Sequence, residues 1–306
     1  MGSTEGEVRW MAITLICEPG VVKTREEFVG TPYGIALDGY VHGAPWFDRS
    51  GPTRNFNHHE DVDRGCTRAT CAQVAFAIRT GLFSGFSTKN GLPHANVYIN
   101  DHDQDVCLST FALLYPETLF GAQPAMNRLL YLEDMLDSAA GLYPVSRDSK
   151  RELGWIFAPY VRTRGLSLNG TESLGVIADV HARIWAYLAG KGGIAAADEE
   201  PAYCVRARQG ALALLEARDP GARSGFALEG IFAFVAYRLV DGGPNYTFTL
   251  GRASPEVPFD VSAAITELAS TEPGWGGGDT VAGSPRHVGS TQSPQDVWEV
   301  ARKYYG

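Results

Sequence analysis

The sequence contains no uninterrupted apolar run of the roughly 18 residues that a membrane-spanning helix needs. Its N-terminal residues also lack the basic segment and apolar core of a secretory signal peptide. The five cysteines are scattered, and no CxxC pair occurs among them. Such spacing favours reduced thiols over a disulfide framework. We therefore expect a cytoplasmic protein with no membrane partner.

Positive charge is scarce as well, since 26 lysines and arginines face 35 aspartates and glutamates and leave a formal net charge of −9. Proteins that bind duplex nucleic acid without sequence preference depend on a basic surface. We therefore expect no duplex nucleic acid as a partner. A small phosphorylated substrate or a short single-stranded oligonucleotide is compatible with this charge, because a metal centre and a few arginines suffice to hold it.

The remaining composition is that of a globular protein with a substantial core, with 44% hydrophobic and 20% charged residues in a chain of 306. Around 190–200 the residues become small and charged, which is typical of a linker. We therefore expect one domain over 1–189 and a second, smaller domain over 201–306. A homodimer is compatible with this organisation.

Carboxylates gather immediately after an apolar run over 95–99 that predicts a strand. Asp101, Asp103 and Asp105 occupy alternate positions there, and a helical pattern follows from Val106. On extended backbone these side chains point the same way, so their charges repel unless a cation lies between them. Hard oxygen ligands at this density suit Mg²⁺ or Mn²⁺, and a nearby histidine favours Mn²⁺. The alternative is a solvated turn in which Asp105 caps the following helix.

Two further strand ends carry side chains of ligand type. A predicted strand over 31–40 runs into Asp38, the placement that ligand sites favour in open α/β sheets. His58 and His59 stand among carboxylates just before a predicted helix over 67–80. A histidine at such an edge is well placed to bind a metal while a carboxylate fixes its other nitrogen. Asp38, the histidine pair and the three aspartates all lie where a strand is expected to end, and this predicts one metal site.

Another acidic stretch lies at the end of the next apolar pattern. Asp134 and Asp137 are three residues apart, so on a helix they share a face, and either can reach a metal. The segment 166–188 has the spacing of a core helix, and we assign it no chemistry.

The second half of the chain holds three consecutive glycines, Gly276, Gly277 and Gly278. Such a run permits close backbone approach and leaves N–H groups free, which suits an anionic ligand. A plain flexible loop is the alternative. Arg252 and Arg286 favour the anion, because guanidinium groups match the geometry of phosphate.

The pattern of this half also predicts secondary structure. We expect a helix over 203–217, a strand over 245–250 and a helix that starts within 259–265, with Asp260 as its cap.

Taken together, these residues resemble a known family. The stretch 101–109 is similar to the DxDxDxxxS motif of the DHH phosphoesterases, in the form seen in the RecJ-type exonucleases. His58 and His59 resemble the motif that names the superfamily, with Asn57 where its aspartate is usual.

The remaining motifs of that family also have counterparts. Asp38-Gly39 is similar to the second family motif, a strand that ends in a metal-binding aspartate. Asp137-Ser138 resembles the fourth motif. The motif order is rearranged, because the counterpart of the first motif lies between those of the third and the fourth.

The C-terminal part resembles the DHHA1 domain of oligoribonuclease and phosphatase members. The strand end Leu-Arg-Ser of that domain is echoed at 250–254, and its Asp-Val-Ser helix at 259–265. Its GGGHxxAAG loop is echoed at 276–283, with Asp279 in the place of the histidine.

The resemblance implies an α/β fold with a mainly parallel sheet flanked by helices, followed by a smaller DHHA1-like α/β domain. It implies a hydrolase for a phosphodiester or phosphomonoester of a nucleotide, a short oligonucleotide or a small phosphorylated metabolite. Two divalent ions, Mn²⁺ or Mg²⁺, would activate the attacking water. A catalytically degenerate module that binds a nucleotide or a protein partner is the alternative.

The site residues that the resemblance implies fall into three groups. The metal ligands are drawn from Asp38, His59, Asp101, Asp103, Asp105, Asp134 and Asp137. The catalytic residues are His58, His59 and Asp103. The residues for the substrate phosphate are Arg252, Ser254, Gly276, Gly277, Gly278, Asp279 and Arg286. Which of His58 and His59 binds a metal, and which of Asp134 and Asp137, the sequence leaves open.

Overall fold

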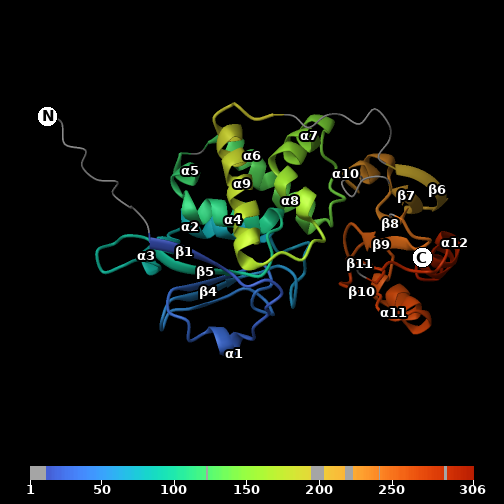
Figure 1. Ribbon diagram of the computed structural model, residues 1–306, viewed down its shortest axis with the longest axis horizontal. Coiled ribbons are helices and arrows are strands. Elements are labelled where there is room, and N and C mark those ends of the chain that lie inside the picture. The colour runs from blue at the N-terminus through green and yellow to red at the C-terminus, as the bar shows by residue number, and fades with distance from the viewer. Residues whose placement is uncertain (1–11, 122, 194–202, 218–222, 241, 286–287) are drawn as a thin grey trace. The chain divides into compact units, whose positions relative to one another are not determined.

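The computed structural model is of the mixed α/β class, with two mixed sheets that are flanked by helices (Figure 1). It describes residues 12–121, 123–193, 203–217, 223–240, 242–285 and 288–306. Most of the expected linker at 190–200 lies outside these residues, as does Arg286. The chain divides into two compact units, Met1–Asp134 with Gly154–Gly193, and Met135–Leu153 with Ile194–Gly306.

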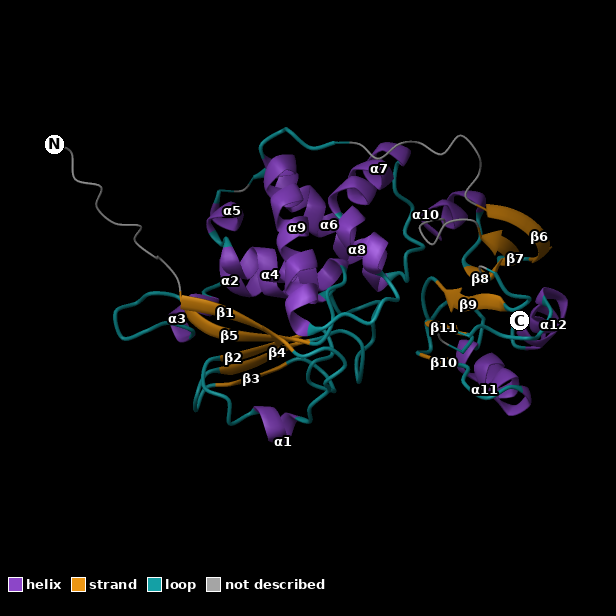
Figure 2. Ribbon diagram, in the orientation of Figure 1, coloured by secondary structure: helices purple, strands orange, loops and turns teal. Residues whose placement is uncertain are grey.

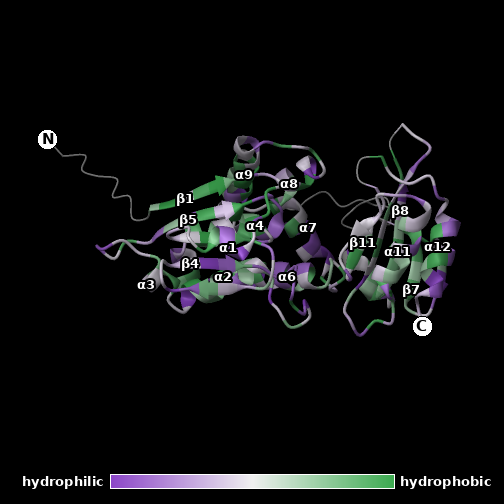
Figure 3. Ribbon diagram, turned by 90° about the horizontal axis from the view of Figure 1, so that it is seen from below, coloured by the Kyte–Doolittle hydropathy of each residue, from purple (hydrophilic) through white to green (hydrophobic). Residues whose placement is uncertain are grey.

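The first unit is built on a five-stranded sheet of order β1-β5-β2-β4-β3. The strands are β1 Ala12–Cys17, β2 Gly34–Leu37, β3 Trp46–Asp48, β4 Thr53–Phe56 and β5 His94–Ile99. The pairs β1–β5, β5–β2 and β2–β4 are parallel, and β3 adds an antiparallel edge. The predicted strand at 95–99 is confirmed, and the strand predicted at 31–40 is present but shorter, over Gly34–Leu37. Figure 3 shows that β1 is hydrophobic along its length, and as an edge strand it is only partly buried.

Helices cover both faces of this sheet. They are α1 Arg25–Phe28, α2 Thr70–Arg79, α3 Leu82–Gly85, α4 Gln104–Leu114, α5 Glu117–Phe120, α6 Pro124–Ser138, α8 Ala158–Thr163 and α9 Gly170–Leu188. Figure 2 shows α2, α4 and α9 on one face and α1 on the other. The helix α4 is buried from Asp105 to Leu113, because it lies between the sheet and its neighbours and therefore needs apolar residues all round. Among the described residues, every helix is too short or too polar to span a membrane.

The parallel strands determine where the polar side chains meet. The strands β2, β4 and β5 run in the same direction, so their C-terminal ends lie at one edge of the sheet. Asp38 follows β2 directly, the segment 57–59 follows β4, and Asp101 lies two residues beyond β5. This edge therefore carries the side chains that the sequence singles out.

The second unit is built on a six-stranded sheet of order β10-β11-β9-β8-β7-β6. The strands are β6 Tyr203–Gln209, β7 Leu212–Ala217, β8 Ala233–Leu239, β9 Tyr246–Arg252, β10 Gly276–Gly277 and β11 Val281–Gly283. The helices are α7 Arg147–Ile156, which ends within the first unit, α10 Arg223–Phe226, the 3-10 helix η2 Ala227–Glu229, α11 Val261–Thr271 and α12 Pro294–Lys303. Residues of α11 and α12 share an apolar core with one face of the sheet.

The helix predicted at 203–217 is wrong, because the structure forms the antiparallel strands β6 and β7 there. Gly210 has a φ of +59° and lies between the two strands, where a left-handed residue permits the turn. In β7 the run 212–215 is buried throughout, because Leu212 and Leu214 pack into one apolar core and Ala213 and Leu215 into another on the opposite face. An apolar run that is buried on both faces does not alternate, so periodicity alone does not separate it from a helix.

Two other predictions for this unit are confirmed. The strand predicted at 245–250 corresponds to β9, which begins one residue later, at Tyr246. The side chain of Asp260 accepts a hydrogen bond from the backbone N–H of Ala263 and caps α11, as expected.

Gly170, the first residue of α9, packs closely against the end of β1. A Cβ added to Gly170 would lie 2.3 Å from the carbonyl oxygen of Cys17, whereas one added to Gly175 meets no described atom within 4 Å beyond its own helix. We expect Gly170→Ala to lower the free energy of unfolding by about 1–3 kcal/mol through overpacking. We expect Gly175→Ala to raise it by about 0.5–1 kcal/mol through helix propensity. Urea unfolding monitored by circular dichroism measures both, and equal effects would contradict this packing.

Candidate metal centre

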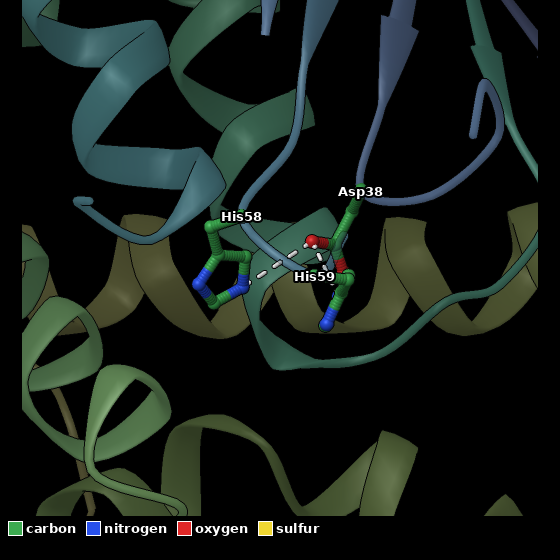
Figure 4. Close-up of side chains that lie close together, drawn as sticks. All are labelled: Asp38, His58 and His59. Carbon is green, nitrogen blue, oxygen red and sulfur yellow. Dashed lines mark ion pairs between the residues drawn. The ribbon is translucent and has the colours of Figure 1, made fainter. Parts of the chain in front are cut away.

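Asp38, His58 and His59 form a cluster at the C-terminal ends of β2 and β4. The Nε2 atom of His59 lies 2.9 Å from Oδ1 of Asp38, and Nε2 of His58 lies 3.5 Å from the same oxygen. Figure 4 shows an ion pair from each of the two imidazole rings to the Asp38 carboxylate. The ligand atoms of these three residues all lie within 4.8 Å of one another, which is close enough for one ion to contact all of them. The sequence prediction that these strand ends meet is therefore confirmed for these three residues.

The carboxylate of Asp38 is buried, and its charge is balanced by neighbours. Burial raises the pKa of Asp38, but the charge and hydrogen bond of His59, with His58 and Thr70, outweigh burial and hold this pKa below its usual range. The hydroxyl of Thr70 donates to Oδ1 of Asp38 at 2.9 Å. Asp38 is therefore ionised near neutral pH, as a metal ligand must be.

The backbone also positions Asp38. Its φ is +50°, in the left-handed region that residues with a Cβ rarely adopt, and Gly39 follows with a φ of +83°. The imidazole of His59 lies beside Gly39, because a Cβ added there would lie 3.8 Å from its Cδ2. The strained turn after β2 thus directs the carboxylate toward the histidines, and strain of this kind is concentrated at functional sites.

The two histidines differ in their access to solvent. The side chain of His58 is fully buried, and its Nε2 lies 3.5 Å from Asp38 and 3.6 Å from Oδ2 of Asp105. The side chain of His59 is 32% exposed. A ligand from solvent can therefore reach the cluster at His59, while His58 lies between two carboxylates.

The carboxylate of Asp105 caps a different helix from the one expected. Its two oxygens accept hydrogen bonds from the backbone N–H groups of Thr70, at 2.7 Å, and Cys71, at 2.6 Å, so Asp105 caps α2. The cap of α4 is Asp103, whose Oδ1 accepts from the N–H of Val106 at 2.9 Å. Because α4 begins at Gln104, Asp105 does not share an extended stretch with Asp103, and the expected alternation ends there.

The N-terminus of α2 is further held by the acidic end of α6. Oδ1 of Asp134 accepts from the backbone N–H of Ala69 at 2.7 Å. Three successive N–H groups at this helix start therefore donate to two carboxylates, in keeping with the positive end of the helix dipole. Asp137 lies three residues beyond Asp134 on α6 and so shares its face; the division into units assigns Asp137 to the second unit.

Asp101 lies apart from the Asp38 cluster. Its side chain is 62% exposed, and its Oδ1 accepts from the backbone N–H of His102 at 2.6 Å. The imidazole of His102 lies 3.3 Å from the hydroxyl of Thr163. In the part of the chain that the structure describes, neither Asp101 nor Asp103 belongs to a group that could hold an ion.

The donor set at the cluster fits a divalent ion. It offers one buried carboxylate and two imidazoles from adjacent strand ends, and a second buried carboxylate, Asp105, lies against His58. Mixed oxygen and nitrogen ligands suit Mn²⁺ better than Mg²⁺, which prefers oxygen alone. The Asp38, His58 and His59 side chains would hold such an ion.

Sequence reasoning missed two residues that support this cluster. Thr70 is the first residue of α2, one position after the N-cap Ala69, and its hydroxyl donates to Asp38. Asn57 binds the backbone of both histidines through its side-chain oxygen. The signal for Asn57 was its place immediately before the histidine pair; Thr70 gave none.

The glycine-rich stretch of the second unit forms a hairpin. Gly276 and Gly277 pair with Gly283 and Ala282 as β10 and β11, and Gly277 has a φ of +142°. The N–H of Gly278 donates to the carbonyl of Val281 at 2.9 Å, so this group is not free as expected.

The arginine of this region pairs with the residue that replaces the family histidine. Arg252 Nη2 lies 3.5 Å from Oδ2 of Asp279, whose side chain is 67% exposed. Ser254 lies in the turn after β9, and Arg286 lies outside the described residues. Asp279 therefore reduces the positive charge that Arg252 offers to a phosphate.

A comparison of the chain with protein-family models finds no match, and a comparison with curated proteins finds none either.

Asparagine can take over the capping role of Asp103 but not that of Asp105. Asp105→Asn would turn an NH₂ group toward a backbone N–H of α2, and we expect a loss of about 1–3 kcal/mol in the free energy of unfolding. Asp103→Asn keeps an acceptor for the N–H of Val106, and asparagine caps helices as well as aspartate, so we expect a change within about 0.5 kcal/mol. Urea unfolding of both variants without added metal measures the difference. A loss at Asp103 as large as that at Asp105 would show that these roles are assigned wrongly.

Proposed function

We propose that this protein is a divalent-metal-dependent phosphoesterase of the DHH/DHHA1 type. Its substrate class would be a phosphodiester or phosphomonoester of a nucleotide, a short single-stranded oligonucleotide or a small phosphorylated metabolite. The observation that carries the proposal is the cluster of Asp38, His58 and His59 at the ends of adjacent parallel strands. The resemblance of the 101–109 stretch to the DxDxDxxxS motif supports the reaction class.

The proposed centre uses two ions, Mn²⁺ or Mg²⁺. Asp38, His58 and His59 would hold the first, and Asp105, which lies against His58, would contribute to the second. The resemblance also assigns Asp101, Asp103, Asp134 and Asp137 to the second ion, which Asp101 and Asp103 would reach only by moving from their positions here. Two ions of this kind lower the pKa of a shared water and stabilise the charge of an in-line displacement. A carboxylate has several acceptor positions, so the bonds that Asp103, Asp105 and Asp134 accept from backbone N–H groups are compatible with binding a metal as well.

The two histidines have separate proposed roles. His59 is reachable from solvent, so it would bind the ion at the side where substrate enters. His58 is buried between Asp38 and Asp105, so it would bind the ion from the interior side and keep both carboxylates oriented. Burial of Asp38 and His58 also excludes water from one side of the cluster, which strengthens its electrostatic interactions.

The second unit carries the residues that the resemblance assigns to a phosphate. Arg252 supports this part of the proposal, because its buried Nε has no hydrogen-bond partner in the described part of the chain. Ser254 and the Gly276–Gly277 backbone lie on the same sheet region, at the end of β9 and beside β11. Asp279 opposes a strongly anionic ligand, so a phosphodiester with one charge fits better than a phosphomonoester with two.

A non-catalytic module that binds a nucleotide or a protein partner is the second candidate. The observation that favours it is the use of Asp103, Asp105 and Asp134 as helix caps, since such roles account for these carboxylates without a metal. Asn57 and Asp279, where the family has aspartate and histidine, point in the same direction.

Assays with bis-(p-nitrophenyl) phosphate, p-nitrophenyl phosphate and short oligonucleotides, each with Mn²⁺, distinguish the two candidates. We expect turnover that ends with EDTA, and we expect Asp38→Asn to lower kcat/KM by at least about 100-fold because it removes a charged ligand. The control is Asp48→Asn, since Asp48 closes an exposed turn through the N–H and hydroxyl of Ser50. Full activity of Asp38→Asn at saturating Mn²⁺ would refute the site. Tight nucleotide binding without turnover would establish the module instead.

A further inference from the structure

Asn57 lies between the histidine pair and the loop that follows β2. It is fully buried, and its Oδ1 accepts hydrogen bonds from the backbone N–H groups of His58, at 2.8 Å, and His59, at 3.0 Å. Its Nδ2 faces three oxygens, donating to Gly43 O at 3.0 Å, to Glu60 Oε2 at 2.6 Å and to Val41 O at 3.4 Å.

These hydrogen-bond partners determine which terminal atom of the Asn57 side chain is the oxygen and which is the nitrogen. Two N–H donors surround Oδ1, and three acceptors surround Nδ2, so a flipped amide would meet like groups on both sides. The backbone carbonyl of Asn57 is held as well, because it accepts from Nε2 of Gln73 on α2 at 2.8 Å. The turn that carries both histidines is therefore fastened to the loop at 41–43 and to α2 through one residue.

We propose that Asn57 is a positioning residue that holds His58 and His59 in register with Asp38, and that this role requires an amide. The inference rests on the proposed function, because holding the histidines beside Asp38 matters for activity only if they bind a metal. The hydrogen bonds themselves do not depend on a metal. Aspartate, which the family motif has at this place, retains an acceptor for the two histidine N–H groups. Its second oxygen would face the Glu60 carboxylate and two carbonyls without a proton to share. Restoring the family residue would thus disrupt the turn instead of adding a ligand.

Asn55 provides a matched comparison, since it is a buried asparagine that faces the same loop. Its Nδ2 lies 3.3 Å from Val41 O, 3.3 Å from Gly43 O and 3.4 Å from Ala44 O. Its Oδ1 has no hydrogen-bond partner in the described residues, so it does not contact the histidine backbone. Asn55→Asp therefore also places a negative charge against the carbonyls of Val41 and Gly43. It alters no hydrogen bond to the backbone of His58 or His59.

The test compares Asn57→Asp, Asn55→Asp and the double variant Asn57→Asp with Glu60→Gln. Amide hydrogen exchange by NMR, without metal, reports directly on the N–H groups of His58 and His59. Isothermal titration with Mn²⁺ reports on the cluster. We expect Asn57→Asp to accelerate exchange at these two amides by about tenfold or more and to weaken Mn²⁺ binding by about 10- to 100-fold. In the double variant, the amide introduced by Glu60→Gln can donate to the carboxylate introduced by Asn57→Asp, so both effects should be partly reversed.

The outcomes separate this inference from the proposed function. Exchange that accelerates in Asn57→Asp but not in Asn55→Asp, with partial reversal in the double variant, supports the positioning role even if the wild-type protein binds no Mn²⁺. Unchanged exchange at His58 and His59 in Asn57→Asp would overturn it. Equal acceleration in Asn55→Asp would also overturn it, since the effect would then come from the shared loop. Absence of Mn²⁺ binding to the wild type would contradict the proposed function alone.

Discussion

The first unit depends on balancing one buried negative charge, the carboxylate of Asp38 at the end of β2. An isolated carboxylate in such a position would cost several kcal/mol, so its partners must be built into the fold. His59, His58 and Thr70 supply them, from the turn after β4 and the start of α2. A divalent ion fits the same position, because it would meet the same charge with the two imidazoles as further ligands.

The start of α2 connects this charge to the rest of the unit. Its first N–H groups donate to Asp105 and Asp134, while the Thr70 hydroxyl donates to Asp38. A helix N-terminus stabilises nearby carboxylates. The N-terminus of α2 therefore stabilises acidic side chains of α4 and α6 at the edge of the sheet where β2 and β4 end. The acidic residues at this edge therefore have a structural role at the start of α2.

Much of the first unit could be predicted from the sequence, and the reasons are local. The strands at 31–40 and 95–99 follow from short apolar runs and the helix at 67–80 from its apolar stripe. Parallel strands then bring Asp38 and the histidines to one edge. The partner of Asp105 could not be predicted, because its two bonds reach residues 34 and 35 positions away, whereas a local rule gives it the nearest helix. The β6–β7 pair was missed for another reason: a strand that is buried on both faces lacks the alternation that identifies strands.

Anomalous diffraction from crystals of the protein soaked in Mn²⁺ tests the central claim most directly. The account predicts a manganese peak with Oδ1 of Asp38 and Nε2 of His59 about 2.1 Å away. A structure in which Mn²⁺ leaves this position empty, with the Asp38–His59 ion pair intact at 2.9 Å, would contradict it.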